Sequence, residues 1–241
     1  MAYQTGDNIL DNHYNDFATS VNAIWGSGSG DSGYGQTNTV SSVDTSTTVQ
    51  ASQWTTLLAR VTSLASHQGS SITSITNPSA GDQIEAFTAL STNIATVTTN
   101  RLNVSSRASI AEANCSTTTT LGTSSIQQEG NWTWGSDAQA RYFFNTGGRC
   151  SVRWDLSSHT SDSKADEWNT LASNCGSYII NAQSSGKSGG GGSTTTNETD
   201  KGWHDLTSSF QTVFKQNVAS SYTANFIDLQ LKKDSSGVMY F

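Results

Sequence analysis

The sequence predicts an α+β protein. Short helices joined by extended Gly- and Ser-rich linkers are expected in the N-terminal part, and an antiparallel β-sandwich or jelly-roll-like domain in the C-terminal part. Apolar residues recur three times at helical spacing within the first hundred residues, and an alternating, aromatic-rich pattern replaces this spacing from about residue 110. We therefore divide the chain into a helical region, residues 1–108, and a β domain, residues 109–241.

The first two helices are predicted from a repeat with an offset of 40 residues, in which residues 9–25 align with residues 49–65. Each copy carries four apolar residues at the spacing 3, 4, 3: Tyr14, Phe17, Val21 and Ile24 in the first, and Trp54, Leu57, Val61 and Leu64 in the second. This spacing predicts one narrow apolar stripe on each helix, as wide as a coiled-coil seam and narrower than the face of a globular core helix.

A third helix is predicted because the same spacing returns after Gly81 and Asp82, two residues that favour a helix start. Its apolar stripe consists of Phe87, Leu90, Ile94 and Val97. The three stripes either pack on one another within a single chain or pack against neighbouring copies of it. Because short helices rich in Ser and Thr are marginally stable alone, we favour a homo-oligomer, with a trimer as its preferred form.

The segments between these helices are predicted to be irregular. Residues 26–49 are rich in Gly and Ser, which favours a loop or an extended arm that reaches the next helix. The single proline, Pro78, predicts a further turn.

The second half is predicted to be built mainly from strands. Residues 141–145 and 149–154 flank a Thr-Gly-Gly turn signal, so we expect a β-hairpin there. We expect short helices or loops at residues 163–173 and 208–214, and a mobile loop tip at residues 186–200, which contain four consecutive glycines. Further strands are expected at residues 176–182, 203–206, 226–231 and 238–241.

The chain is poor in charge and rich in hydroxyl groups. Only 13% of the residues are charged, the net charge is −7, and Ser and Thr together account for 72 of 241 residues. No basic residue precedes Arg60, which disfavours nucleic acid as a partner of the first quarter. No apolar stretch reaches the 18 residues of a membrane span, so we predict no membrane insertion.

The N-terminal segment has neither the basic nor the apolar region of a signal peptide, so we expect synthesis in a reducing cytoplasm. Three widely spaced cysteines, Cys115, Cys150 and Cys175, make a poor disulfide framework and no metal motif. We predict that they are reduced, structural residues.

The sequence predicts no catalytic residue, no metal and no cofactor. A phosphate-binding loop at Gly186 would need a glycine where Asn181 stands. Asp166 and Glu167 are adjacent and cannot face each other across a substrate. The four histidines, which have no zinc-binding spacing, are His13, His67, His159 and His204.

Three residues are candidate contacts for a ligand: Trp132, Trp134 and Lys187. An exposed tryptophan could stack on a sugar ring, and Lys187 lies at the start of the glycine-rich segment. The competing interpretation, which we favour for the two tryptophans, is that one packs on the core and the other on a neighbouring strand.

Several longer segments resemble a known group of proteins. The segments GDNILDNHYNDF, GSGSGDSGYGQ and VQASQWTTLLARVTSLASHQG resemble virion structural proteins of tailed bacteriophages, cyanophages among them, of the tail-fibre, tail-appendage or neck type. In the second half, ARYFFNTGGRCSVRW, DEWNTLASNCGSYI, GWHDLTSSFQTVF and SYTANFIDLQLK are similar to the β domain of the same proteins. The resemblance covers most of the chain.

The resemblance implies a non-enzymatic, oligomeric part of the virion, made in the host cytoplasm. It implies other tail, neck or baseplate proteins as partners, attachment through the N-terminal region, and a projecting β domain. Similar proteins continue past the strand at residues 237–241, which implies that another chain completes this strand or that the domain extends further. The alternative function is a receptor- or carbohydrate-binding module, with a host surface glycan as its ligand.

Overall fold

A computed structural model describes residues 11–44, 49–79, 87–106, 125–156, 162–183, 185–190, 199–200, 205–218, 222 and 224–241. In these residues the chain is an α+β protein with five α-helices and two antiparallel sheets. It divides into two compact units: residues 1–109 together with 141–148, and residues 110–140 together with 149–241.

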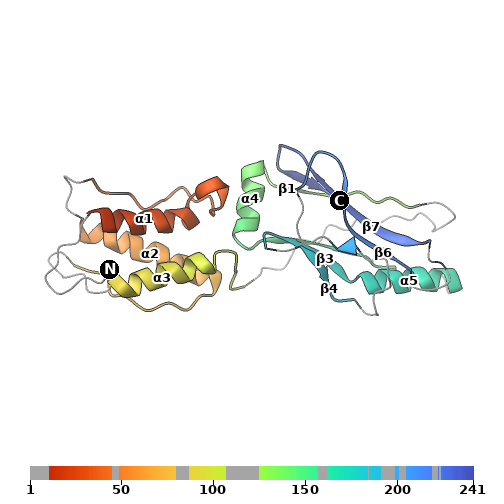
Figure 1. The fold of residues 1–241 in the computed structure, drawn as a ribbon, viewed down its shortest axis with the longest axis horizontal. Coiled ribbons are helices and arrows are strands. Elements are labelled where there is room, and N and C mark those ends of the chain that lie inside the picture. The colour runs from red at the N-terminus through yellow and green to blue at the C-terminus, as the bar shows by residue number, and fades with distance from the viewer. Residues whose placement is uncertain are drawn as a thin grey trace. The chain divides into compact units, whose positions relative to one another are not determined.

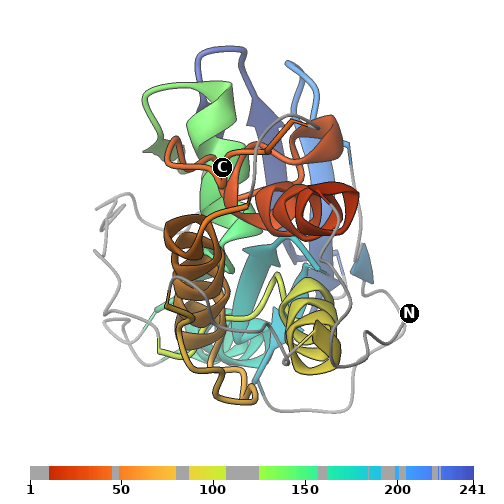
Figure 2. The same ribbon diagram turned by 90° about the vertical axis from the view of Figure 1, so that its left-hand side faces the viewer.

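The first unit contains three helices that pack against one another (Figures 1 and 2). They are α1 (Asp11–Trp25), α2 (Ala51–Gln68) and α3 (Phe87–Thr99), at the positions predicted from the apolar spacing. Gly81 and Asp82, the predicted helix start, lie outside the described residues. Threonine hydroxyls on α2 and α3 donate hydrogen bonds to carbonyl oxygens four residues earlier, as Thr92 does to Thr88, so the many hydroxyls of these helices have partners within the helix itself.

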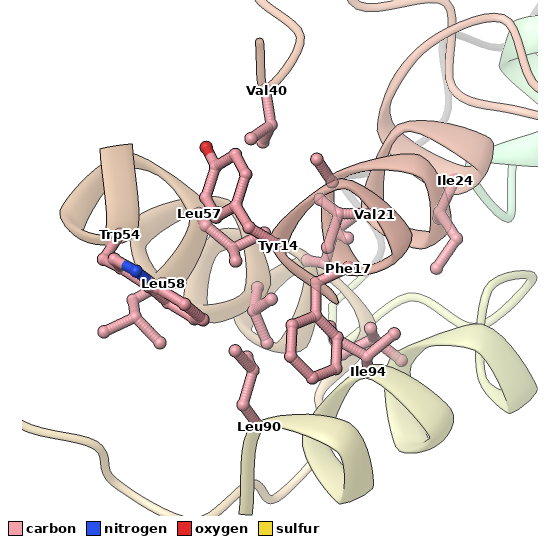
Figure 3. Close-up of a cluster of buried hydrophobic side chains, with 14 of the residues drawn as sticks. Tyr14, Phe17, Val21, Ile24, Val40, Trp54, Leu57, Leu58, Leu90 and Ile94 are labelled. Atoms are coloured by element: carbon pink, nitrogen blue, oxygen red, sulfur yellow. The ribbon is translucent and has the colours of Figure 1, made fainter. Parts of the chain in front are cut away.

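The predicted stripes meet in one hydrophobic core within a single chain (Figure 3). Eleven of the twelve predicted residues are buried, and Phe87 is partly buried against the same cluster. This is the single-chain arrangement, so the stripes themselves are used within the chain. The prediction of a narrow seam was wrong, because Leu58 and Ala65 of α2 and Ala18 of α1 widen the buried faces and Val40 and Val43 of the following segment close the core.

Two asparagines of α1 hold the extended segment that follows it. Asn22 donates from Nδ2 to the Val40 carbonyl and accepts from the Val40 amide at Oδ1, both at 2.8 Å. Asn15 makes the same pair of bonds to Val43, also at 2.8 Å. The seven residues from Asn15 to Asn22 rise about 10.5 Å along the helix, and the three extended residues from Val40 to Val43 span about 10 Å. The spacing of the two asparagines therefore matches that of their two partners. The Gly- and Ser-rich segment therefore runs back along α1 before α2 begins.

We predict that Asn22→Asp destabilises the helical unit by about 1–3 kcal/mol, because a carboxylate cannot donate to the Val40 carbonyl and leaves that oxygen without its partner. The free energy of unfolding from urea titrations measures the change. The matched control is Asn12→Asp, which introduces the same charge at an exposed position of α1. Equal losses in the two variants would contradict a specific role for the Asn22 bonds.

Residues 141–148 complete the first unit, and the predicted hairpin at this place was wrong. Residues 137–145 form a helix, α4 (Asp137–Asn145), whose last turn belongs to the helical unit. Asn145 Nδ2 donates to the carbonyls of Asp31 and Gly33 at 2.8 and 2.9 Å, and Arg141 forms an ion pair with Asp31 at 3.1 Å. The glycines taken for a hairpin turn instead end the helix, where Gly147 and Gly148 donate to the carbonyls of Phe144 and Phe143.

The second unit contains both sheets. The larger has the order β1-β8-β7-β6-β5, and the smaller has the order β2-β3-β4. The strands are β1 (Asn131–Thr133), β2 (Arg149–Arg153), β3 (Ser177–Asn181), β4 (Gly186–Ser188), β5 (Thr199–Asp200), β6 (Gln211–Asn217), β7 (Phe226–Lys233) and β8 (Val238–Tyr240). Helix α5 (Ser163–Cys175) packs against β6 and β7 (Figure 1). Its N-terminus is capped by Asp162, which accepts from the amides of Lys164 and Ala165.

The predicted strands at β2, β3, β7 and β8 and the helix at α5 are confirmed. Two other predictions were wrong: residues 211–214 lie in β6 instead of a helix or loop, and β4 and β5 occupy the two ends of the predicted loop tip at 186–200. The middle of that segment, together with Trp203 and His204, lies outside the described residues, whereas Asp205 and Leu206 are not in a strand.

Candidate functional site

The residue types that most often carry catalysis lie apart or have structural partners. His13 packs edge-on against Phe87, with ring centroids 5.9 Å apart. His67 packs on Tyr34, and its Nε2 donates to the Thr146 carbonyl at 2.9 Å. His159 and His204 are not among the described residues. Within the part of the chain that the structure describes, no three His, Cys, Asp or Glu residues gather as metal ligands.

Cys150 of β2 and Cys175 at the end of α5 are buried, whereas Cys115 lies outside the described residues. Burial raises the pKa of the Cys150 thiol to about 12. Because the thiolate is the nucleophile of cysteine, a thiol with this pKa is nearly inert at neutral pH.

We predict that Cys150 in the folded chain reacts with iodoacetamide about a thousandfold more slowly than in the urea-unfolded chain at the same pH, from the smaller thiolate fraction. Peptide-resolved mass spectrometry of the alkylated chain measures the rate. A Cys115→Ser variant removes the third thiol from the comparison. Similar rates in the folded and unfolded chains would contradict the buried thiol.

The three candidate ligand contacts do not form one site. Trp132 lies in β1, opposite Met239, and its ring packs on Phe241 with centroids 4.4 Å apart. Trp134 follows the same strand, and its amide donates to the Gly237 carbonyl. Lys187 lies on the other sheet, in β4, and donates to the Gln216 side chain at 3.2 Å. The packing of Trp132 agrees with the interpretation that it contacts a neighbouring strand.

A different group of side chains gathers on the larger sheet. Leu229 and Leu231 of β7 are buried, so the alternating residues between and around them face the other way, toward solvent. Register places Lys215 of β6 opposite Asp228, and Tyr240 of β8 opposite Lys232, on this outer face. We call the following five residues the aromatic–lysine face: Phe210, Lys215, Phe226, Lys232 and Tyr240.

Cation–π contacts organise the aromatic–lysine face. The Lys215 ammonium lies 3.8 Å from the centroid of the Phe226 ring. The Lys232 ammonium lies between two rings, 4.3 Å from the centroid of Phe210 and 4.8 Å from that of Tyr240. Each contact favours the charged ammonium near the negative face of a ring. The lysine side chains are thereby held against the sheet.

Two carboxylates near this face accept hydrogen bonds through at least one oxygen. Asp228 Oδ2 accepts from the side chains of Thr212 and Gln230. Asp234, in the β7–β8 turn, accepts from Ser236 and from the Val238 amide, and these bonds lower the pKa of its carboxyl. Desolvation and the Asp234 charge raise the pKa of Tyr240, which donates to Asp234 at 3.3 Å. The raised pKa keeps the Tyr240 phenol neutral at neutral pH.

Sequence reasoning missed this face, although one signal was available. In FIDLQL, predicted as a strand at residues 226–231, Ile227, Leu229 and Leu231 alternate with Phe226, Asp228 and Gln230. Lys232, just beyond it, continues the second row. Assigning the leucines to the core would have placed the other four on one solvent-facing row. The contribution of Phe210, Lys215 and Tyr240 depends on strand pairing, which that pattern does not contain.

Comparison of the chain with protein-family models, with curated proteins and with solved structures finds no match. A search of the described helices finds none with the length and apolar character needed to cross a membrane.

Proposed function

We propose that this chain is a non-enzymatic structural component of a tailed-phage virion, a homo-oligomer attached to the tail, neck or baseplate. The sequence resemblance supplies the class of protein. The observation that carries the oligomer is that none of the fully exposed residues of α2 and α3 is charged. Arg60, the charged residue of α2, is half-buried over the Trp25 ring. The exposed residues are Ser52, Thr56, Ala59, Thr62, Ser63 and Ser66 on α2, and Thr88, Ser91, Thr92, Ala95, Thr98 and Thr99 on α3.

These two faces are suited to close contact with another protein. Helix faces that stay in water usually carry charged side chains, which are costly to bury. Hydroxyls cost less, because several of those on α2 and α3 already donate to the helix backbone and leave their methyl groups outward. Since the predicted stripes are used within the chain, these outer faces are the surface left for neighbouring copies.

Light scattering of the purified full chain tests the oligomer, with a trimer expected. Thr92→Lys on α3 should shift the chain toward the monomer, because it brings a charge into the contact. Thr19→Lys, at an exposed position of α1, is the matched control and should leave the mass unchanged. A wild-type chain that remains monomeric at high concentration would contradict the oligomer.

The virion location has its own test. Antibodies raised against the full chain, imaged by electron microscopy with gold labels, should mark one part of the tail, neck or baseplate of particles of the phage that encodes it. Labels absent from intact and opened particles would contradict the assignment, whatever the mass of the purified chain.

We further propose that the second unit is a β-sandwich in which the smaller sheet and α5 cover the inner face of the larger sheet. Tyr178 of β3 packs on Phe214 of β6, with ring centroids 5.6 Å apart, and donates to the Val213 carbonyl. Trp154 packs on the same Phe214 ring at 5.5 Å. These contacts support face-to-face packing of the two sheets.

The second candidate function is a receptor- or carbohydrate-binding module. It is favoured by the two large hydrophobic side chains that stand exposed among the described residues, Tyr222 at 38% and Phe226 at 44%. Tyr222 lies in the β6–β7 connection, and Phe226, the first residue of β7, belongs to the aromatic–lysine face. A glycan array distinguishes the two candidates, because an internal connector should retain no glycan.

A further inference from the structure

We propose that the aromatic–lysine face binds an acidic polysaccharide, a chain of sugars that carry carboxylates such as uronic acids. The inference rests on the second candidate function and names its ligand class and its residues. It moves the contact surface from Trp132, Trp134 and Lys187 to the outer face of β6, β7 and β8.

The two lysines of this face offer positive charge to an anionic ligand. Within the described residues, neither Lys215 nor Lys232 forms an ion pair with a carboxylate. Asp228 stands directly opposite Lys215, yet its Oδ2 is bonded to Thr212 and Gln230 while the ammonium turns to the Phe226 ring. Both ammonium groups therefore keep N–H donors for an anion from outside, and a ligand carboxylate matches them.

The surface beside the lysines suits a sugar ring. Phe226 is 44% exposed, so part of its ring is open to a ligand even though Lys215 contacts it. A sugar ring presents apolar C–H groups to an aromatic ring and polar groups at its edge. Gln230, exposed between the two lysines on β7, adds an amide that hydroxyl groups can bond.

The two lysines lie at separate positions along the sheet. Asp228, opposite Lys215, and Lys232 are four residues apart on one strand, which corresponds to about 13 Å. Both lysines are held against rings on the same face of the sheet. An extended chain with repeated carboxylates can therefore contact both lysines, whereas a single small anion contacts one.

Nucleic acid also combines negative charge with stacking rings. Its affinity comes largely from the many phosphates that a protein neutralises, and this face offers two lysines. Binding of oligothymidylate is therefore a competing outcome of the test.

Isothermal titration of the full chain with oligogalacturonate, a polymer of uronic acid, tests the proposal. A neutral maltooligosaccharide of equal length and oligothymidylate serve as competing probes. We expect binding of oligogalacturonate that weakens with salt, and no measurable binding of the neutral probe. Lys215→Met and Lys232→Met each remove a charged donor. Each should lower the affinity for oligogalacturonate about tenfold or more.

Lys233→Met is the matched control, because Lys233 is exposed on the same strand but alternates to the other face. It should leave the affinity unchanged, and thermal unfolding should show all three variants to be folded. Phe226→Ala should weaken binding and leave its salt dependence intact. The proposal is overturned by no binding of oligogalacturonate, by equal loss in Lys233→Met, or by tighter binding of oligothymidylate. Retention of a neutral glycan on the array without binding of oligogalacturonate would overturn this inference and leave the second candidate function standing, so the two proposals fail separately.

Discussion

Leu57→Ala is expected to lower the stability of the helical unit by about 2–5 kcal/mol, the range for a truncated buried leucine. Leu57 is fully buried at the centre of α2, in the cluster formed with the apolar residues of α1 and α3 (Figure 3). Truncation removes apolar contacts and leaves a cavity that a three-helix core cannot fully close. Hydrogen–deuterium exchange, measured peptide by peptide, gives the loss of stability in the helical unit separately from any change in the second unit.

The same experiment distinguishes the two arrangements of the apolar stripes. Because Leu57 is buried within one chain, the stability lost in Leu57→Ala should not depend on protein concentration. A stripe buried between chains would give a loss of stability that depends on concentration. Thr56→Ala, at the neighbouring exposed position, should change stability by less than about 0.5 kcal/mol. A loss in Leu57→Ala that, measured against the wild type at the same concentration, grows on dilution would contradict the single-chain core.

Gly33→Ala is expected to cost about 3 kcal/mol, although Gly33 has an ordinary φ. A Cβ atom at this position would lie 2.1 Å from the Gly26 carbonyl oxygen and 2.8 Å from the Gly28 nitrogen. These are backbone atoms, which cannot rotate away as a flexible side chain would. The Gly33 amide donates to the Ser27 carbonyl, and the Gly33 carbonyl accepts from Asn145. A displacement of Gly33 therefore also weakens the contacts by which residues 141–148 complete the helical unit.

Gly30→Ala is the control within the same loop. Gly30 has a φ of +60°, but a Cβ there meets no atom within 4 Å, so the expected cost is only the left-handed conformation, about 1–2 kcal/mol. Urea titrations of both variants, monitored by far-UV circular dichroism, measure the difference. A loss in Gly33→Ala no larger than that in Gly30→Ala would show that the close approach is relieved without strain.

The helices could be predicted from the sequence because their signal is local. The spacing of Tyr14, Phe17, Val21 and Ile24 sets one buried face whatever that face packs against. What covers the face is not local. Asn15 and Asn22 bind a segment about twenty to thirty residues further along, and the apolar spacing contains no trace of this pairing.

The errors in the second half also have physical causes. The aromatic run before Gly147 reads as a strand by composition, but Ser136 and Gln139 provide a helix-start signal that the tertiary contacts of Arg141 and Asn145 support. The aromatic–lysine face could be predicted only along β7, where alternation is visible. Its remaining members come from neighbouring strands, and register is a long-range property.

The closure of the helical unit by residues 141–148 sets an order of events during synthesis. Ribosomes add about 5–20 residues per second, so the segment that completes this unit is translated about 2–8 seconds after residue 109. Throughout that interval the nascent helices lack the Arg141 and Asn145 contacts to the loop around Asp31. The first unit to begin folding therefore cannot finish until a piece of the second half has left the ribosome.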